Sequence, residues 1–158
     1  MKITAAKIKN SLIAFFGIDR LNSQFLNFAV SHLCFVIAIN IHSVFVNILL
    51  MRVSDDVNIT IYYNMISYFC SGFGMLLGGM IIKRLDLKYI TFLGIGCHVV
   101  AYGIFLFFMD EIAVFMIPLA ILIGFGGGFF WYTYLNAISF YSEDDTREIS
   151  ISFIGVFA

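Results

Sequence analysis

The sequence predicts an all-α membrane protein with four transmembrane helices and the start of a fifth. Of its 158 residues, 61% are hydrophobic and only 12% are charged, about half of the roughly 25% charged residues in an average soluble domain. The charged residues fall in five short clusters: 2–20, 52–56, 83–88, 110–111 and 143–148. The runs between them contain no Asp, Glu, Lys or Arg, and each exceeds the roughly 18 residues that indicate a membrane-spanning helix. This pattern excludes a soluble enzyme and a disordered tail, and the net charge of −1 gives no electrostatic basis for nucleic-acid binding.

The segment 1–20 mixes lysines with apolar side chains, and two interpretations of it remain open. It is either a cytoplasmic tail or a short interfacial helix with its apolar face against lipid headgroups. Its apolar stretch Ser11–Ile18 ends at Asp19–Arg20, so it is too short for a cleaved signal peptide. We therefore expect the first long apolar run to stay in the protein as a signal anchor.

The first span is predicted near residues 25–51, and it carries a polar stripe. Helical spacing places four of its polar side chains on one face, opposite a face of Phe, Val, Leu and Ile: His32, Asn40, Ser43 and Asn47. Polar groups inside a membrane need a partner or water. Hydrogen bonding to a neighbouring helix and a water-accessible cavity both explain such a stripe, and the sequence does not choose between them.

The second and third spans are predicted near 59–82 and 89–109, and both contain glycines at helical spacing. Gly74 and Gly78, with Gly79, form a small-xxx-small face that lets another helix approach closely. On the third span we expect three glycines to act as packing notches: Gly94, Gly96 and Gly103. His98 lies in the middle of the third span, and we interpret it as a buried, hydrogen-bonded histidine.

The fourth span is predicted near 112–140, and a fifth helix starts from 149. Pro118 falls two turns inside the fourth span, where it would kink a helix. A glycine cluster follows at Gly124, Gly126, Gly127 and Gly128. The last apolar run, Ile149–Ala158, is too short to span a membrane, so we expect a truncated fragment of a longer protein. We also expect the glycine faces of the second and fourth spans to need covering helices from outside the chain.

The basic residues predict the orientation. Eight of the nine Lys and Arg residues fall on one side if the spans alternate, so the N-terminus is predicted in the cytoplasm of a bacterial cell. Each of the three cysteines, Cys34, Cys70 and Cys97, lies alone in an apolar run. We interpret them as small core-filling residues and expect no metal and no cofactor.

The connection after the second span carries a family resemblance. The run Gly78–Lys88, GGMIIKRLDLK, resembles a degenerate form of the G-x-x-x-D-R-x-G-R-R loop of the major facilitator superfamily. Gly79, Arg84 and Lys88 match that motif, whereas Lys83 replaces its Asp and Asp86 replaces its second Gly. The glycine-rich fourth span, with its Phe130–Tyr132 segment and the acidic loop containing Arg147, is similar to the 4–5 region of the same family. The resemblance covers about residues 20–158.

The resemblance implies a transporter of twelve helices in two halves that works by alternating access. This chain would be a truncated N-terminal half, residues 21–158, and its partners would be lipid, a small-molecule substrate and the second half of the same polypeptide. In that family the first and fourth helices line the substrate cavity. Our cavity candidates are Asn40, Asn47, Trp131, His32, Ser43 and Asn136.

The leading functional hypothesis is secondary active transport of a small solute, with export as a candidate direction. Because the spans hold no carboxylate, proton coupling within them would need His32, His42 or His98. The alternatives are a non-transport membrane module for assembly, sensing or scaffolding, and a truncated non-functional fragment. A membrane enzyme comes third, and we expect no enzymatic activity, because the carboxylate clusters lie at helix ends and are explained as solvated loop charges.

Overall fold

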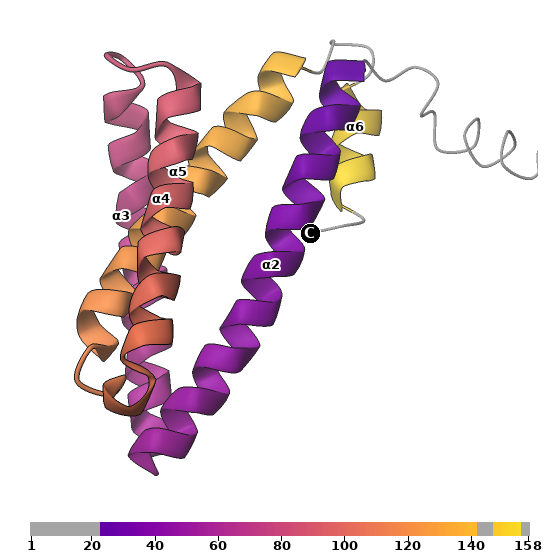
Figure 1. Cartoon of the computed structure of the whole chain (residues 1–158). Coiled ribbons are helices and arrows are strands. Elements are labelled where there is room, and N and C mark those ends of the chain that lie inside the picture. The colour runs from indigo at the N-terminus through magenta and orange to yellow at the C-terminus, as the bar shows by residue number, and fades with distance from the viewer. Residues whose placement is uncertain (1–22, 142–146, 156–158) are drawn as a thin grey trace, which may run out of the picture. The chain divides into compact units, whose positions relative to one another are not determined.

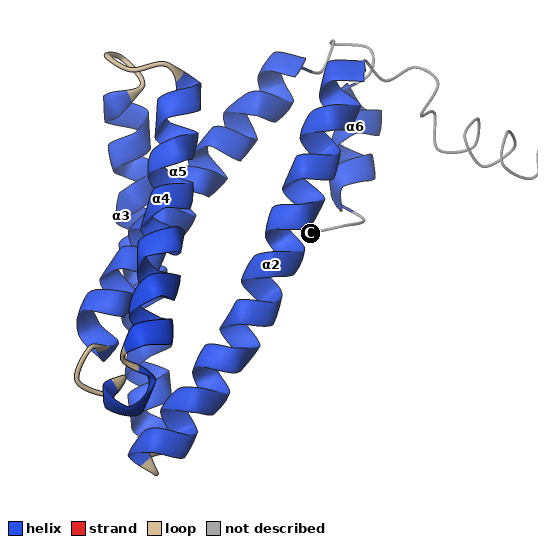
Figure 2. Cartoon of the chain, in the orientation of Figure 1, coloured by secondary structure: helices blue, strands red, loops and turns tan. Residues whose placement is uncertain are grey.

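The computed structural model describes residues 23–141 and 147–155, so the predicted tail or interfacial helix at 1–20 lies outside the described residues. The elements are α2 (Ser23–Ser54), α3 (Val57–Ile81), α4 (Leu87–Phe107), a 3-10 helix (Met109–Glu111), α5 (Met116–Tyr141) and α6 (Arg147–Gly155) (Figure 1). Helices and their connections account for all of the described chain, which has no strand (Figure 2). The predicted all-α class is therefore confirmed.

Four of these helices, α2 to α5, are long and apolar enough to cross a membrane. Their outward surfaces are apolar: Phe45 is 68% exposed, Leu106 80% and Phe107 85%. A water-soluble monomer rarely exposes large contiguous apolar patches, whereas lipid tails are as apolar as these side chains. The chain is accordingly an integral membrane protein. Helix α5 is the most enclosed of the four. In the most apolar 18-residue stretch of each helix, 44% of the residues are buried in α5, against 11% in α2 and 11% in α3.

The described chain forms two compact units. The central unit comprises Ile41–Leu135, and the terminal unit comprises the residues up to Asn40 together with those from Asn136 onward. The central unit has an apolar core at the end where α2 meets α3 and α4 leads into α5. Its buried members are Val46, Leu50, Tyr63, Ala101, Phe105, Ile112, Leu119 and Ala120. In the terminal unit, the buried residues include Phe25, Ala29, Ala137 and Ser150.

Two aspartates end α2 and start α3. Asp55 has a positive φ of 53° and its N–H donates to the Met51 carbonyl at 3.1 Å, which terminates α2 in the left-handed conformation common at helix ends. Asp56 then caps α3, because its carboxylate accepts from the Asn58 backbone N–H at 2.9 Å. The chain therefore turns from α2 into α3 over two residues, Asp55 and Asp56. The adjoining ends of the two helices contribute to the same apolar core.

The predicted position of Pro118 within its helix was wrong. Helix α5 begins at Met116 rather than near 112, because a 3-10 helix and a turn occupy 109–115. Pro118 therefore lies in the first turn, where backbone N–H groups have no acceptor within the helix. A proline there removes no helical hydrogen bond, so its expected role as a kink two turns inside the span does not apply.

Close glycine contacts join α3 and α4 to α5. A Cβ built on Gly74 would lie 2.9 Å from the Phe125 carbonyl oxygen, and one on Gly78 would lie 2.9 Å from the Tyr132 ring. A Cβ on Gly94 of α4 would lie 2.9 Å from the Gly126 carbonyl oxygen. Real Cβ atoms do not approach this closely, so these positions require glycine, and the predicted packing roles of Gly74, Gly78 and Gly94 are confirmed.

Two expectations about glycine were wrong. Gly96 and Gly103 are not packing notches, because a Cβ at either position meets nothing within 4 Å. The glycine faces of the second and fourth spans also need no cover from outside the chain, because they cover each other. Gly124 and Gly128 of α5 lie against the Ser67 and Ser71 carbonyl oxygens of α3.

Candidate functional site

The predicted polar stripe of α2 divides into buried and exposed members. His32 is only 2% exposed, and the Phe28 ring stacks beside it with the centroids 6.4 Å apart. Asn40 and Ser43 are exposed. The Asn40 amide nitrogen donates to the Val36 carbonyl of its own helix at 3.0 Å. The stripe therefore presents an amide and a hydroxyl on an otherwise apolar helix surface.

Asn47 makes a hydrogen bond between two helices. The Asn64 amide nitrogen on α3 donates to the Asn47 side-chain oxygen at 3.0 Å and to the Thr60 carbonyl at 2.8 Å. Bonds of this kind between transmembrane helices contribute about 0.6 kcal/mol on average. Helix–helix bonding, one of the two explanations of the stripe, therefore holds for Asn47. No local pattern indicates Asn64 as the partner, because that pairing depends on how α2 packs on α3.

Trp131 lies on the α5 surface of the central unit. It is 37% exposed, and it meets the buried Tyr134 ring edge-to-face with the centroids 5.3 Å apart. The centroid of the buried Phe130 ring lies 6.5 Å from that of the indole. These neighbours support the indole while leaving part of it exposed. Asn136, the remaining cavity candidate, is half-buried and belongs to the terminal unit.

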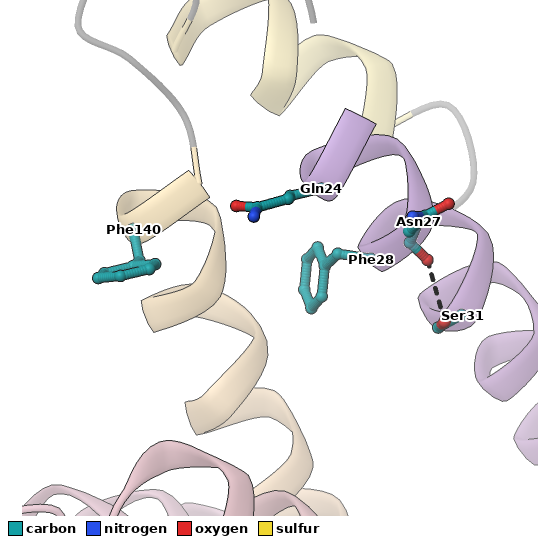
Figure 3. Close-up of a pocket in the computed structure, with 5 residues that line it drawn as sticks. All are labelled: Gln24, Asn27, Phe28, Ser31 and Phe140. Atoms are coloured by element: carbon teal, nitrogen blue, oxygen red, sulfur yellow. Dashed lines mark hydrogen bonds between the residues drawn. The ribbon is translucent and has the colours of Figure 1, made fainter. Parts of the chain in front are cut away.

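An open pocket of about 600 Å³ lies within the terminal unit, and none of the six cavity candidates lines it. Figure 3 shows Gln24 and Phe28 extending from α2 toward the part of α5 that carries Phe140. Asn27 and Ser31 complete the lining, and the Ser31 hydroxyl donates to the Asn27 carbonyl at 3.0 Å. Its lining combines amide, hydroxyl and aromatic groups, and it is open rather than enclosed. The spacing 24, 27 and 31 was a helical signal that the sequence interpretation did not use.

A cluster of rings joins α2 to α4 in the central unit. The His42 ring lies on Tyr102, with the centroids 4.1 Å apart, and against Phe105 at 5.2 Å. His98 meets the same Tyr102 ring edge-to-face at 5.9 Å. His98 is also buried, with its Nδ1 2.9 Å from the Gly94 carbonyl oxygen, so its interpretation as a buried, hydrogen-bonded residue is confirmed.

The predicted loop motif runs from the last turn of α3 into the first turn of α4. A Cβ built on Gly79 would lie 3.5 Å from the Tyr132 ring. The four charged members, Lys83, Arg84, Asp86 and Lys88, are exposed. Asp86 and Lys88 form an ion pair at 3.6 Å, and the Lys88 ammonium lies 4.9 Å from the Tyr89 ring centroid. An exposed pair of this kind contributes at most about 1 kcal/mol.

The cysteines differ in their surroundings. Cys70 and Cys97 are half-buried beside the α5 glycines, where a Cβ on Gly124 or Gly126 would lie 2.6 or 2.9 Å from the cysteine Cβ. Cys34 is exposed on α2, so its expected role as a core-filling residue was wrong. Across residues 23–141 and 147–155, no three His, Cys, Asp or Glu side chains lie close enough to hold a metal ion.

Comparison with known proteins gives one relative. A protein of Geobacillus stearothermophilus named "Uncharacterized protein in sodM 3'region" is 25% identical over 123 residues, which cover 77% of this chain. The chain spans 57% of the length of that relative. No protein-family model matches the chain, and no solved structure matches it.

Proposed function

We propose that this protein is part of a secondary active transporter that moves a small solute across a bacterial cytoplasmic membrane by alternating access, with a fold of the major facilitator type. The observation that carries the proposal is the exposed Asn40 near the middle of α2. An exposed amide at the depth of the lipid tails is costly unless it faces water or a ligand. A solute pathway supplies both.

The hydrogen bonding of Asn40 supports this proposal. An asparagine side chain has two N–H donors and an acceptor oxygen with two lone pairs. Among the described residues, the Asn40 side chain makes one hydrogen bond, from its nitrogen to the Val36 carbonyl. The remaining capacity is available to water or to a polar solute. Ser43 lies one turn further along α2 and is also exposed.

The chemistry of the spans indicates the class of solute. They present amides, hydroxyls, imidazoles and aromatic rings, and the runs between the charged clusters contain no Asp, Glu, Lys or Arg. Trp131 adds a partly exposed indole for stacking. We therefore propose a polar solute held by hydrogen bonds and ring contacts. The eight-to-one distribution of basic residues supports an N-terminus in the cytoplasm.

The test is flux through vesicles that carry the full-length protein. Inside-out vesicles are incubated with a mixed extract of small metabolites, and the solutes that accumulate are identified by mass spectrometry. Asn40→Leu should abolish the accumulation found with the wild type while membrane insertion is unchanged. Ile41→Leu, at the neighbouring exposed apolar position, is the matched control and should transport normally. Unchanged flux in both Asn40→Leu and Asn47→Leu would defeat the assignment.

A second candidate is a non-transport membrane module, and the Asn47–Asn64 bond favours it, because the stripe then acts partly to hold helices together. The reading frame beyond Ala158 separates the two functions. Completion of a fifth and sixth span, followed by six more, supports transport. A stop codon shortly after Ala158 supports the module.

A further inference from the structure

We propose that the connection between α3 and α4 binds the headgroups of anionic phospholipids, and that Lys83 and Arg84 supply the charges that select them. We call residues 82–88 the basic loop. The proposal rests on charge at the membrane surface that the protein itself does not neutralise, and it does not depend on transport. The occupant is an acidic phospholipid of the surrounding bilayer.

The basic loop lies at the level of the lipid headgroups. It joins two helices of the central unit that are each long and apolar enough to cross a membrane (Figure 2). Helix α4 has 21 residues, which is about 31 Å at a rise of about 1.5 Å per residue and matches a hydrocarbon core of about 30 Å. The start of α4 therefore falls at the boundary between acyl chains and headgroups, and the loop before it lies among the phosphates.

The backbone of the loop holds two cations side by side in a tight turn. The Arg84 N–H donates to the Ile81 carbonyl at 2.8 Å, and the Leu85 N–H donates to the same carbonyl at 3.0 Å. Lys83 and Arg84 are consecutive residues of this turn, and both are exposed. Because α3 leads directly into the turn, these two charges stay close to the membrane surface.

The protein provides no counter-charge for this pair of cations. Asp86 is the one carboxylate of the loop, and it pairs with Lys88 at 3.6 Å. Asp86 also stands at the N-cap of α4 without making a side-chain capping hydrogen bond. Within the described chain, Lys83 and Arg84 form neither an ion pair nor a side-chain hydrogen bond. The loop therefore carries a net charge of +2.

Apolar side chains flank these charges, and they suit a lipid better than a soluble anion. Leu85 is 47% exposed and Tyr89 is 52% exposed, and the Lys88 ammonium lies 4.9 Å from the Tyr89 ring centroid. Tyrosine is common where acyl chains meet headgroups, because its ring is apolar and its hydroxyl is polar. A phospholipid offers a phosphate to the cations and an acyl chain to the apolar groups, whereas free phosphate offers only the first.

The expected lipid preference follows from the two uncompensated cations. A Lys or Arg near an anionic membrane surface favours the bound state about fivefold, so two of them should favour an anionic over a zwitterionic lipid about 25-fold. The transmembrane helices already anchor the loop in the membrane. Its charges therefore do not recruit the protein, and they act on which lipid lies beside it.

The experiment measures which lipid lies beside the basic loop. The full chain carries Tyr89→Trp and Trp131→Phe, which leaves a single tryptophan at the loop, and it is reconstituted into mixed vesicles of phosphatidylcholine and phosphatidylglycerol. One of the two lipids is supplied with brominated acyl chains, which quench a neighbouring tryptophan. The quenching should show a preference for phosphatidylglycerol of about 25-fold at low salt. At about 1 M salt, where charges are screened beyond about 3 Å, the preference should largely disappear.

Two double variants test the charges directly. Lys83→Gln with Arg84→Gln should abolish the preference for phosphatidylglycerol, because the remaining Lys88 is paired with Asp86. Lys83→Arg with Arg84→Lys keeps both charges and should retain the preference. The salt dependence provides the measurement if the glutamine variant does not fold. Inorganic phosphate, added at constant ionic strength, should not reduce the preference.

Tyr62→Trp in the same Trp131→Phe background is the matched control, because Tyr62 is 57% exposed and lies near the opposite end of α3. The connection at that end contains Asp55 and Asp56 against the single cation Arg52, so no preference for phosphatidylglycerol is expected there. Equal quenching by the two lipids at residue 89, or an equal preference at residue 62, would overturn the proposal. So would a preference that survives loss of both charges, or one that inorganic phosphate abolishes.

Discussion

The packing of α3 on α5 makes a sharp prediction at two adjacent glycines. A Cβ on Gly128 would lie 2.8 Å from the Gly74 Cα and 2.9 Å from the Met75 nitrogen, and it would also meet the Ser71 carbonyl oxygen. All three contacts are backbone atoms, which cannot turn aside as a side chain can. A Cβ on Gly127 would meet only the Ser71 hydroxyl, at 3.8 Å. Gly128→Ala should therefore destabilise the protein relative to Gly127→Ala.

The magnitude follows from how far the helices must separate. Ordinary contacts begin near 3.4 Å, so Gly128→Ala requires α3 and α5 to move apart locally by at least about 0.6 Å to clear the Gly74 Cα, and by more to clear the Ser71 carbonyl oxygen. A gap of this size forfeits about a quarter of the dispersion energy of the facing atoms, and overpacking costs about 1–3 kcal/mol. Replacing glycine by alanine within a helix gains about 1 kcal/mol at either position. That gain cancels between the variants, so Gly128→Ala should be less stable than Gly127→Ala by about 1–3 kcal/mol.

The assay is reversible unfolding in mixed detergent micelles, with tryptophan fluorescence as the signal that reports unfolding. Trp131 is the single tryptophan in the sequence, and it lies one helical turn beyond Gly128, so it reports on this part of α5. The free energies of unfolding of the two variants are compared under the same conditions. Equal stabilities, or a Gly128→Ala variant more stable than Gly127→Ala, would refute the close approach of α3 to α5.

Two further predictions concern other contacts within the central unit. A double-mutant cycle with Asn47→Leu and Asn64→Leu, measured by unfolding in detergent, should give a coupling free energy of about 0.6–1.7 kcal/mol. The reason is that the two amides share one interhelical hydrogen bond. A coupling free energy of zero would contradict that hydrogen bond. Gly126→Ala should displace His98 from the Gly94 carbonyl and shift the His98 Nδ1 NMR signal, whereas Gly96→Ala, with open space at its Cβ, should leave it unchanged. Identical His98 spectra in both variants would contradict the packing of α5 on His98.

The spans could be predicted from the sequence because hydrocarbon excludes charge, and the charges occur only between the helices. The start of α5 could not, because residues 112–115 are as apolar as the helix that follows and form a turn. Gly94 and Gly96 are equivalent in the sequence, yet only Gly94 faces α5. Which glycine is needed depends on the direction from which the next helix approaches.

The candidate site shows the same division. Helical spacing placed Asn40, Ser43 and Asn47 on one face of α2, but it could not tell which of them meets another helix. Local sequence periodicity also could not predict the contact of His42 with Tyr102, because the two residues are 60 positions apart and meet only when α2 packs on α4. Local periodicity therefore predicts faces, and tertiary packing decides their partners.

Thiol labelling tests the central claim, that the polar face of α2 meets water within the membrane. Asn40→Cys, Ser43→Cys and Phe45→Cys are each introduced with Cys34, Cys70 and Cys97 replaced by alanine, and intact cells are treated with a charged, membrane-impermeant thiol reagent. Residues 40, 43 and 45 are all exposed on α2, so exposure alone does not separate water from lipid. The account predicts labelling of the first two variants and none of the Phe45→Cys variant. Absence of labelling in all three, or equal labelling of all three, would contradict it.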